Sequence, residues 1–464
     1  MITSAPLRVS PSPLRSSFSP IHNLLSLPTP YFAAMKQDLI RPFLLFFLFS
    51  GLSVLTAQTE KDSPTSFKNW EIKPILGVQL WSTYTMGHQD YVPESDTYVD
   101  ASDRLNFLVR RMRFGSTAKI GDRLFLKFLG AADWIGEDQR SGPPGGVNNG
   151  AFPNAQIWDI FAQYKLSPKS EALYVIGGYL RPPVGRESMS GALGTSSMEK
   201  GFNQWYMRQH LTGTGPGGAG GVYLGGLSSL SEKIHVDYRA GVFNPQNNGI
   251  TGGRTSSSLL VSRLNFMFGD PEKETWTYGL PAANSFGKRR TVALALNLAN
   301  EGPTGAAPEG TSLLGVDGLI NLGHFHLEGE YHRMIRKSSE PDLESATWMI
   351  RTGVNIDVSP AGADVPRYLE PSLMFYGFDG TTDIEDYPAV LATNYFGGRE
   401  TIINAGVNYH LVPGKVRIGL HYTAISGDRG DLPADGQLSH YFSQPGVGGI
   451  QRGDYAGFEL ILNY

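Results

Sequence analysis

Residues 455–464 read Tyr-Ala-Gly-Phe-Glu-Leu-Ile-Leu-Asn-Tyr, and the sequence ends there. Side chains alternate between the two faces of a β-strand. One face of this stretch carries Phe458, Leu460, Leu462 and Tyr464, and the other carries Glu459 and Asn463. A strand with such an apolar face cannot be left as a free edge, so we expect it to pair with the first strand and close a barrel. The stretch predicts an all-β barrel with apolar groups outside and polar groups inside.

The same alternation recurs along the chain. It predicts fifteen further strands near 72–86, 105–120, 124–134, 156–166, 173–181, 222–226, 233–243, 259–268, 291–299, 313–322, 325–334, 348–357, 369–378, 400–411 and 416–423. Many are about ten residues long, as tilted membrane strands require. Short and long links alternate between them, which is typical of a bacterial outer-membrane barrel with short periplasmic turns and long outer loops.

One link breaks the alternation, because 269–288 should be a short turn and is long. A missed strand pair there would change the count of about 16 by two. We expect Arg289 and Arg290, which follow it, to be an anchor on the periplasmic side. A large soluble β-sandwich or β-helix would also alternate, but it would not explain a secretion signal together with a terminal aromatic strand.

The N-terminal region predicts export. Residues 1–34 are expected to be a non-structural extension, with translation starting at Met35. Residues 35–57 combine basic residues, a short apolar run and Ala57 at a plausible cleavage point, which predicts a signal peptide. Residues 58–69 would form a short periplasmic lead, and 70–464 the transmembrane barrel of the bacterial outer membrane.

Composition excludes several functions. Removing the four basic and one acidic side chains of residues 1–57 from the 39 basic and 43 acidic residues leaves a formal charge of −7, which argues against nucleic acid as a partner. There is no cysteine, hence no disulfide framework. We find no phosphate-binding glycine loop and no Gly-x-Ser-x-Gly or His-Glu-x-x-His motif. We therefore expect no enzyme, no catalytic residues and no cofactor, with outer-membrane lipid and small hydrophilic solutes as partners.

Several segments, in this order, resemble the phosphate-selective porin O and P family: Arg110–Gly115, Gly177–Pro183, Gly241–Asn244, Leu327–Tyr331 and Asn404–Tyr409. The resemblance spreads over nearly all of residues 70–464. It implies a sixteen-stranded trimeric porin that passes anions. The glycine-rich stretch 213–221 departs from the family's basic pattern in loop 3, so phosphate preference stays open while a porin is expected.

The strand near 105–120 predicts a basic inner wall. Its alternation places Arg111, Arg113 and Lys119 toward the lumen, and it places Arg110 on the lipid face at the outer rim, where the side chain could snorkel. In the next strand, Lys127 and Asp133 face the lumen and Trp134 faces lipid. A three-residue turn sets Ile120 opposite Leu124, and the same register sets Thr117 opposite Lys127 and Arg111 opposite the pore-wall acid Asp133.

Six cations could act as stepping sites for anions, because rings of Arg and Lys select for anions. They are Arg111, Arg113, Lys119 and Lys127, with Arg181 and Arg208 near loop 3. The alternative is that a polar wall simply balances its own acids, as in a general non-selective porin. Loop 3, from Pro182 to about Gln204, is expected to fold into the pore as a constriction loop. It carries Arg186, Glu187, Glu199 and Lys200, and its acids facing basic wall residues would create a transverse field. An outer cap loop is the alternative.

Two other interpretations were weighed. His326, Glu328, Glu330 and His332 alternate on one strand face, but their spacing is long for one metal ion, so a polar lumen face is expected and no metal site. A barrel lipase would need a Ser–His–acid set at the outer rim, and none is seen. The expected function is passive diffusion of small solutes, with anions such as phosphate preferred. A structural or adhesive barrel is the remaining alternative.

Overall fold

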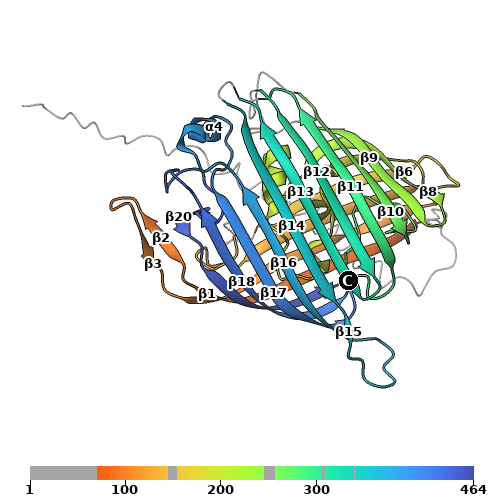
Figure 1. The fold of residues 1–464 in the computed structure, drawn as a ribbon. Helices are drawn as coiled ribbons and strands as arrows, with labels where there is room; N and C mark the ends of the chain where they lie inside the picture. Colours follow the sequence, from red (N-terminus) through yellow and green to blue (C-terminus); the bar gives the residue numbers. More distant parts are fainter. Residues whose placement is uncertain (1–69, 145–153, 245–256, 305–308, 339–340) are drawn as a thin grey trace, which may run out of the picture. The chain divides into compact units, whose positions relative to one another are not determined.

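The computed structural model describes residues 70–144, 154–244, 257–304, 309–338 and 341–464, so the expectations for residues 1–69 lie outside it. Sixteen antiparallel strands close into a barrel (Figure 1). They are β1 (Trp70–Met86), β4 (Arg104–Ile120), β5 (Leu124–Ile135), β6 (Gln156–Lys165), β7 (Tyr174–Leu180), β8 (Ala219–Ser231), β9 (Ile234–Phe243), β10 (Leu259–Gly269), β11 (Arg290–Glu301), β12 (Thr311–Leu322), β13 (Phe325–Arg336), β14 (Leu343–Val354), β16 (Tyr368–Asp379), β17 (Arg399–Val412), β18 (Val416–Asp428) and β21 (Asp454–Asn463).

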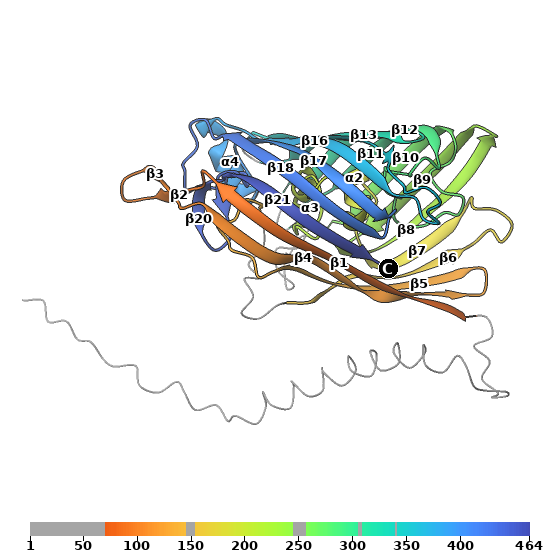
Figure 2. The same cartoon turned by 90° about the horizontal axis from the view of Figure 1, so that it is seen from below.

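The barrel closes where the sequence predicted. On one side β1 pairs with β4, and on the other it pairs with β21, with Leu80 opposite Leu460 and Val78 opposite Leu462 (Figure 2). The pairing therefore occupies both edges of the first strand. A free apolar edge would offer unpaired N–H and C=O groups to another chain, and closure removes it.

The outer wall is apolar. Strand β11 shows the pattern most simply: Leu294, Leu296 and Leu298 are about half exposed, while Ala295 and Asn297 between them are fully buried. The same alternation runs around the wall, and the exposed set is dominated by Leu, Val, Ile, Phe and Tyr. In water this belt would be unstable, whereas in a bilayer it faces hydrocarbon. The molecule is a transmembrane β-barrel of the bacterial outer-membrane type.

The two ends differ as predicted. Short turns at 121–123, 232–233, 323–324 and 413–415 mark the periplasmic end, and the long loops lie at the other. The two-residue strand β15 (Ile356–Asp357) follows β14 and also pairs with β16, before an exposed link, 358–367. At the loop end, loop 1 (87–103) and loop 8 (429–453) build a small sheet that the sequence did not predict, from β19 (Ser443–Gln444), β20 (Gly448–Gln451), β2 (Gln89–Val92) and β3 (Thr97–Asp100). A short 3-10 turn, η2 (Ile384–Asp386), and α4 (Tyr387–Ala392) lie in the loop before β17.

The register predicted for the β4–β5 hairpin is confirmed. Ile120 lies opposite Leu124, Thr117 opposite Lys127, and Arg111 opposite Asp133. A one-residue error here would have turned every side chain to the wrong face.

The placement of Arg110 and Trp134 on the lipid face was wrong. In the pairing with β1, Gln79 lies opposite Arg111 and the next residue, Leu80, lies opposite Val109, so Arg110 is the extra residue of a β-bulge. Trp134 has a φ of 63°, in the left-handed region, and it too falls outside the regular pairing. Both side chains turn inward, where the Arg110 guanidinium lies 3.3 Å from the centre of the Trp134 ring.

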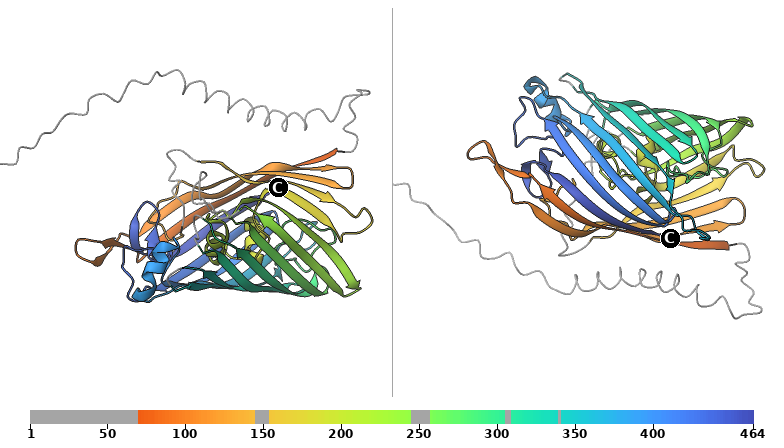
Figure 3. Two further views of the ribbon diagram at one scale, coloured as in Figure 1. Left: turned by 90° about the horizontal axis from the view of Figure 1, so that it is seen from above. Right: turned by 60° about the horizontal axis from the view of Figure 1, so that its bottom comes forward.

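The barrel is not hollow. Loop 3 is longer than predicted and comprises the whole connection 181–218. It contains α2 (Arg186–Met189), η1 (Ala192–Gly194) and α3 (Asn203–Thr212), and its helices lie inside the barrel (Figure 3). The sequence predicted a polar interior, and the structure differs from this in part. Apolar residues of this loop and of the wall form a buried cluster: Leu180, Val184, Tyr206, Met207, Leu211, Phe243, Leu259, Leu313, Met334 and Phe378. In this cluster the inner wall is apolar because its side chains face the inward segment and not water.

Candidate functional site

Loop 3 crosses the lumen and is fastened to several wall strands. All four of its predicted residues are buried: Arg186, Glu187, Glu199 and Lys200. The backbone N–H of Gly185 donates to Asn297 on β11 at 3.0 Å, and Asn408 on β17 donates to the Ser196 carbonyl at 2.6 Å. An outer cap loop would not make these contacts, so the predicted inward course of loop 3 is confirmed.

The first loop acid, Glu187, is bound by an arginine of the wall. Arg351 on β14 donates to its two oxygens at 3.0 and 2.8 Å, and its Nε donates to Glu328 on β13 at 2.9 Å. The guanidinium thus lies between two carboxylates. Because this planar group donates hydrogen bonds to carboxylates on both of its edges, it holds loop 3 against the β13–β14 wall with defined geometry.

The second loop acid, Glu199, lies at the opposite wall. Arg110 and Arg111 on β4 both donate to its carboxylate. Arg111 also donates to Gln79 on β1 at 2.7 Å. Loop acids therefore face wall bases, as expected for a transverse field, but they do so as direct ion pairs. Arg111 is cross-strand from Asp133, yet its carboxylate partner is the loop residue.

The two loop cations are held in different ways. Arg186 donates to both oxygens of Glu272, at 3.0 and 2.6 Å, and its Nε lies 3.5 Å from Asp317 on β12. Lys200 donates to the carbonyls of Glu187 and Ser190. Neither cation points into open space: Lys200 organises the loop itself, and Arg186 fastens the loop to residues outside it.

Three predicted cations come together on the inner wall of β4 to β7. Arg113 pairs with Asp133, and Lys127 pairs with Asp159 at 3.0 Å. Arg181, just after β7, lies 3.7 Å from the same Asp159. In sequence these residues are far apart, and the register of four successive strands brings them side by side.

Trp158 lies among these charges. The Arg113 guanidinium lies 4.6 Å from its ring centre and that of Arg181 lies 5.7 Å from it. Cations over an indole face are stabilised by the ring quadrupole. Trp158 was missed by the sequence analysis because the β5–β6 register shifts between Leu129 and Gly130, and a bulge cannot be read from alternation.

The remaining predicted cations lie elsewhere. Lys119 is exposed next to the Gly121 turn, at the periplasmic end of the same wall. Arg208 on α3 is buried and donates to the hydroxyl and carbonyl oxygens of Ser188, at 2.9 and 2.7 Å. Arg208 therefore supports the inside of loop 3 and does not join the wall cluster, which is a correction to its expected pore-lining place.

Accessibility distinguishes this wall from the rest of the interior. Side chains of Lys127, Asp133, Arg181 and Arg113 keep between 10 and 20% of their surface exposed. The inward residues of β11, such as Asn297, are fully buried. Within the part of the chain that the structure describes, the partly accessible inner charges gather on β4 to β7, which makes this wall the candidate site for solutes.

The alternating His and Glu residues of β13 face the interior, as the polar-lumen interpretation predicted. His326 lies 2.7 Å from Glu370 on β16, and Glu328 binds Arg351. Among the described residues, no group of three or more His, Asp or Glu side chains could hold a metal ion.

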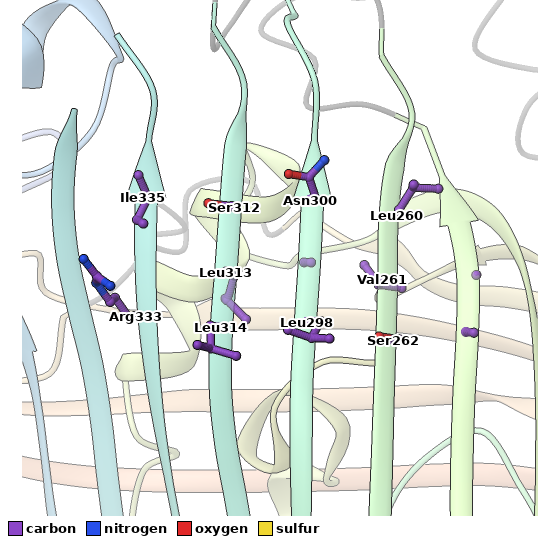
Figure 4. Close-up of a pocket in the computed structure, with 13 residues that line it drawn as sticks. Leu260, Val261, Ser262, Leu298, Asn300, Ser312, Leu313, Leu314, Arg333 and Ile335 are labelled. Atoms are coloured by element: carbon purple, nitrogen blue, oxygen red, sulfur yellow. The ribbon is translucent and has the colours of Figure 1, made fainter. Parts of the chain in front are cut away.

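A hollow of about 670 Å³ lies on the outer wall, away from these charges (Figure 4). Leu260, Leu298 and Leu314 line it, with Arg333 at its edge. These leucines belong to the apolar belt, so the hollow faces lipid and has no part in the inner site.

Comparison with known proteins gives structural likeness only. No family model matches the chain, and no curated protein matches it. Among solved structures, it is similar to an anion-selective porin from Comamonas acidovorans, at 11% identity and a TM-score of 0.48, covering 85% of this chain and 100% of that one. It is also similar to the outer membrane channel DcaP of Acinetobacter baumannii, at 10% identity and a TM-score of 0.48, covering 86% and 99%. A third is OmpT, an outer membrane protein of Vibrio cholerae in a trimer form, at 7% identity and a TM-score of 0.40, covering 85% and 99%.

In the described residues, none of the helices has the length and apolarity that a membrane span requires. The class of protein follows from the strands themselves: a closed barrel of this build, with an apolar belt outside and charges inside, belongs in a bacterial outer membrane.

Proposed function

We propose that the protein is a porin through which small hydrophilic solutes diffuse, and that it prefers anions. The observation that carries the proposal is the charged wall of β4 to β7, whose side chains stay partly exposed inside the barrel. An adhesive barrel has no need of an accessible charged inner wall, whereas a diffusion channel does.

Charge on this wall supports the anion preference. Five basic side chains (Arg110, Arg111, Arg113, Lys127 and Arg181) face three carboxylates (Asp133, Asp159 and Glu199). The paired acids keep the arginines in place, and the excess of cations offsets the dehydration cost of an entering anion. Asp159 is the carboxylate partner of both Lys127 and Arg181. A passing anion can therefore take its place beside either cation.

Reversal potentials in planar bilayers test the proposal. In a potassium chloride gradient, we expect the reversal potential to have the sign that shows chloride to be more permeant than potassium. We also expect added phosphate to block part of the chloride current. A current without ion preference would support the general non-selective porin instead. A barrel that inserts and passes no current would favour the structural or adhesive alternative.

Phosphate selectivity and a homotrimer come into the proposal through the resemblance to the phosphate-selective porin family. Light scattering of the purified protein in detergent tests the second: a mass of three chains supports it and a mass of one contradicts it. No catalytic step forms part of the proposal.

The proposed domain organisation includes the N-terminal residues. We propose that residues 35–57 direct export and are removed after Ala57, and that residues 1–34 are not translated in the native protein. Mass spectrometry of the protein recovered from outer membranes tests this, because a mature chain starting at Gln58 is expected and a chain retaining residues 1–34 would contradict it.

A further inference from the structure

The connection between β10 and β11, residues 270–289, enters the barrel from the end where most turns are short. Gly269 lies opposite Thr291 in the ladder, so the two strands already meet, and a tight turn would join them. The connection contains no strand, and Trp276, Tyr278 and Leu280 in its middle are buried. Its length serves something other than joining two strands.

The middle of this segment packs on the strands of the candidate solute wall. The Trp276 ring stacks on Tyr174 of β7, with 4.9 Å between ring centres, and its backbone N–H donates to Glu171 at 2.9 Å. The Tyr278 hydroxyl accepts from the backbone N–H and the Nε of Arg181, at 3.1 and 3.2 Å. The segment therefore positions one of the accessible cations of the wall.

The same segment is joined to loop 3. Leu280 and Ser190 form a parallel bridge, with the Leu280 N–H donating to the Met189 carbonyl at 3.2 Å. The Arg186 guanidinium binds both oxygens of Glu272. Two segments that enter from opposite ends of the barrel are thus connected in the lumen by a backbone bridge and a buried ion pair.

The far end of the segment is also anchored. Asn284 donates to Glu370 on β16 at 2.8 Å, and Arg289 donates to the carbonyls of Glu272 and Ala282, both at 3.1 Å. Arg289 is buried, so its predicted role as a periplasmic-side anchor was wrong. Its side chain fastens the segment to itself, while Asn284 fastens the segment to the wall.

We propose that residues 270–289 form a second constriction element, which with loop 3 restricts the solute path to the β4–β7 wall and thereby limits the channel to small anions. The effect on transport rests on the proposed function. The position of the segment in the lumen does not depend on it. Inorganic phosphate and chloride are the probes that fit a path bounded by Lys127, Arg181 and Tyr278.

Deletion of the segment tests the proposal through conductance. We expect replacement of residues 271–288 by Asn-Gly to raise single-channel conductance in potassium chloride at least about twofold, because pore width limits the current. The matched control shortens the exposed link 358–367 at the same end, which should leave conductance unchanged. Unchanged conductance in a folded deletion variant would overturn the proposal.

A cysteine pair tests the same proposal without the deletion. The chain has no cysteine, so Ser190→Cys with Leu280→Cys creates the only thiols. We expect this pair to form a disulfide in the folded barrel, seen as a mobility shift that reductant reverses, and failure to form it would contradict the proposed contact. A wild type that passes no current while the deletion variant conducts would contradict the proposed function yet support the constriction.

Discussion

Arg186 and Glu272 form a two-bond ion pair at 2.6 and 3.0 Å in the lumen, although one belongs to loop 3 and the other to the β10–β11 connection. Both side chains are almost completely buried. Breaking a buried pair by removing one partner leaves an uncompensated charge, at a cost of about 3–5 kcal/mol. The pair is therefore sensitive to single substitutions.

We expect Arg186→Ala and Glu272→Ala each to lower the unfolding temperature clearly, and the double variant to lose less than the sum, because the two residues share one interaction. Heat-dependent unfolding of the barrel in detergent measures this. Arg333→Ala with Glu344→Ala is the control, since that ion pair lies on the outside with both side chains about half exposed and should contribute about 0–1 kcal/mol. Additive losses at Arg186 and Glu272 would contradict the coupling.

Lys127→Glu is expected to shift the reversal potential toward cation preference. A unit charge about 4 Å from a passing ion contributes about 1 kcal/mol even in bulk water, so the local occupancy of anions should fall several-fold. Lys169→Glu changes net charge equally on an exposed periplasmic turn and should leave the potential unchanged. Equal shifts in both variants would mean that the wall cluster does not set selectivity.

Glu137, in the loop after β5, predicts a pH dependence. Burial raises the pKa of its carboxyl to about 8, and neither of its oxygens has a hydrogen-bond partner in the structure. The folded state therefore keeps a proton that the unfolded state loses near the ordinary value of 4.5, so stability should fall as pH rises from about 4.5 to 8. Glu137→Gln should remove this slope, as measured by unfolding at several pH values. A variant with the slope of the wild type would contradict the assignment.

His88, in loop 1, predicts the opposite dependence of stability on pH. Burial, with the nearby Arg452 as the next cause, lowers its pKa from 6.5 to about 4. Its contribution to stability is present above pH 6.5 and is lost as pH falls toward 4. Amide exchange in loop 1 should accelerate over this range in the wild type, and it should accelerate less in His88→Gln.

The sequence predicted the strands because lipid imposes one rule on every strand. A side chain at a given position faces either hydrocarbon or the interior, and β11 and β21 show this without exception. The rule fails where the backbone inserts an extra residue. For this reason Arg110 does not lie on the predicted lipid face, and Trp158 lies in the interior although the sequence did not predict it.

The alternation of side chains along the strands could not predict which side chains pair in the lumen. Arg111 lies opposite Asp133, as predicted, yet it binds Glu199, which is 88 positions away. Which acid meets which base depends on the course of loop 3 and of 270–289 through the lumen, and that course is set by long-range packing. The long link was recognised as an irregularity, but no local pattern in it indicates that it turns inward.

Cysteine accessibility tests the central claim, an aqueous path along the inner wall of β4. Thr117 lies on the inner face and is partly accessible, whereas its neighbour Ala118 faces lipid. We expect a negatively charged, water-soluble thiol reagent to modify Thr117→Cys and reduce the current. Ala118→Cys and the covered Ala295→Cys should stay unmodified, because one faces hydrocarbon and the other lies under the inward segments. Modification of Ala118→Cys with Thr117→Cys left unreactive would contradict the account.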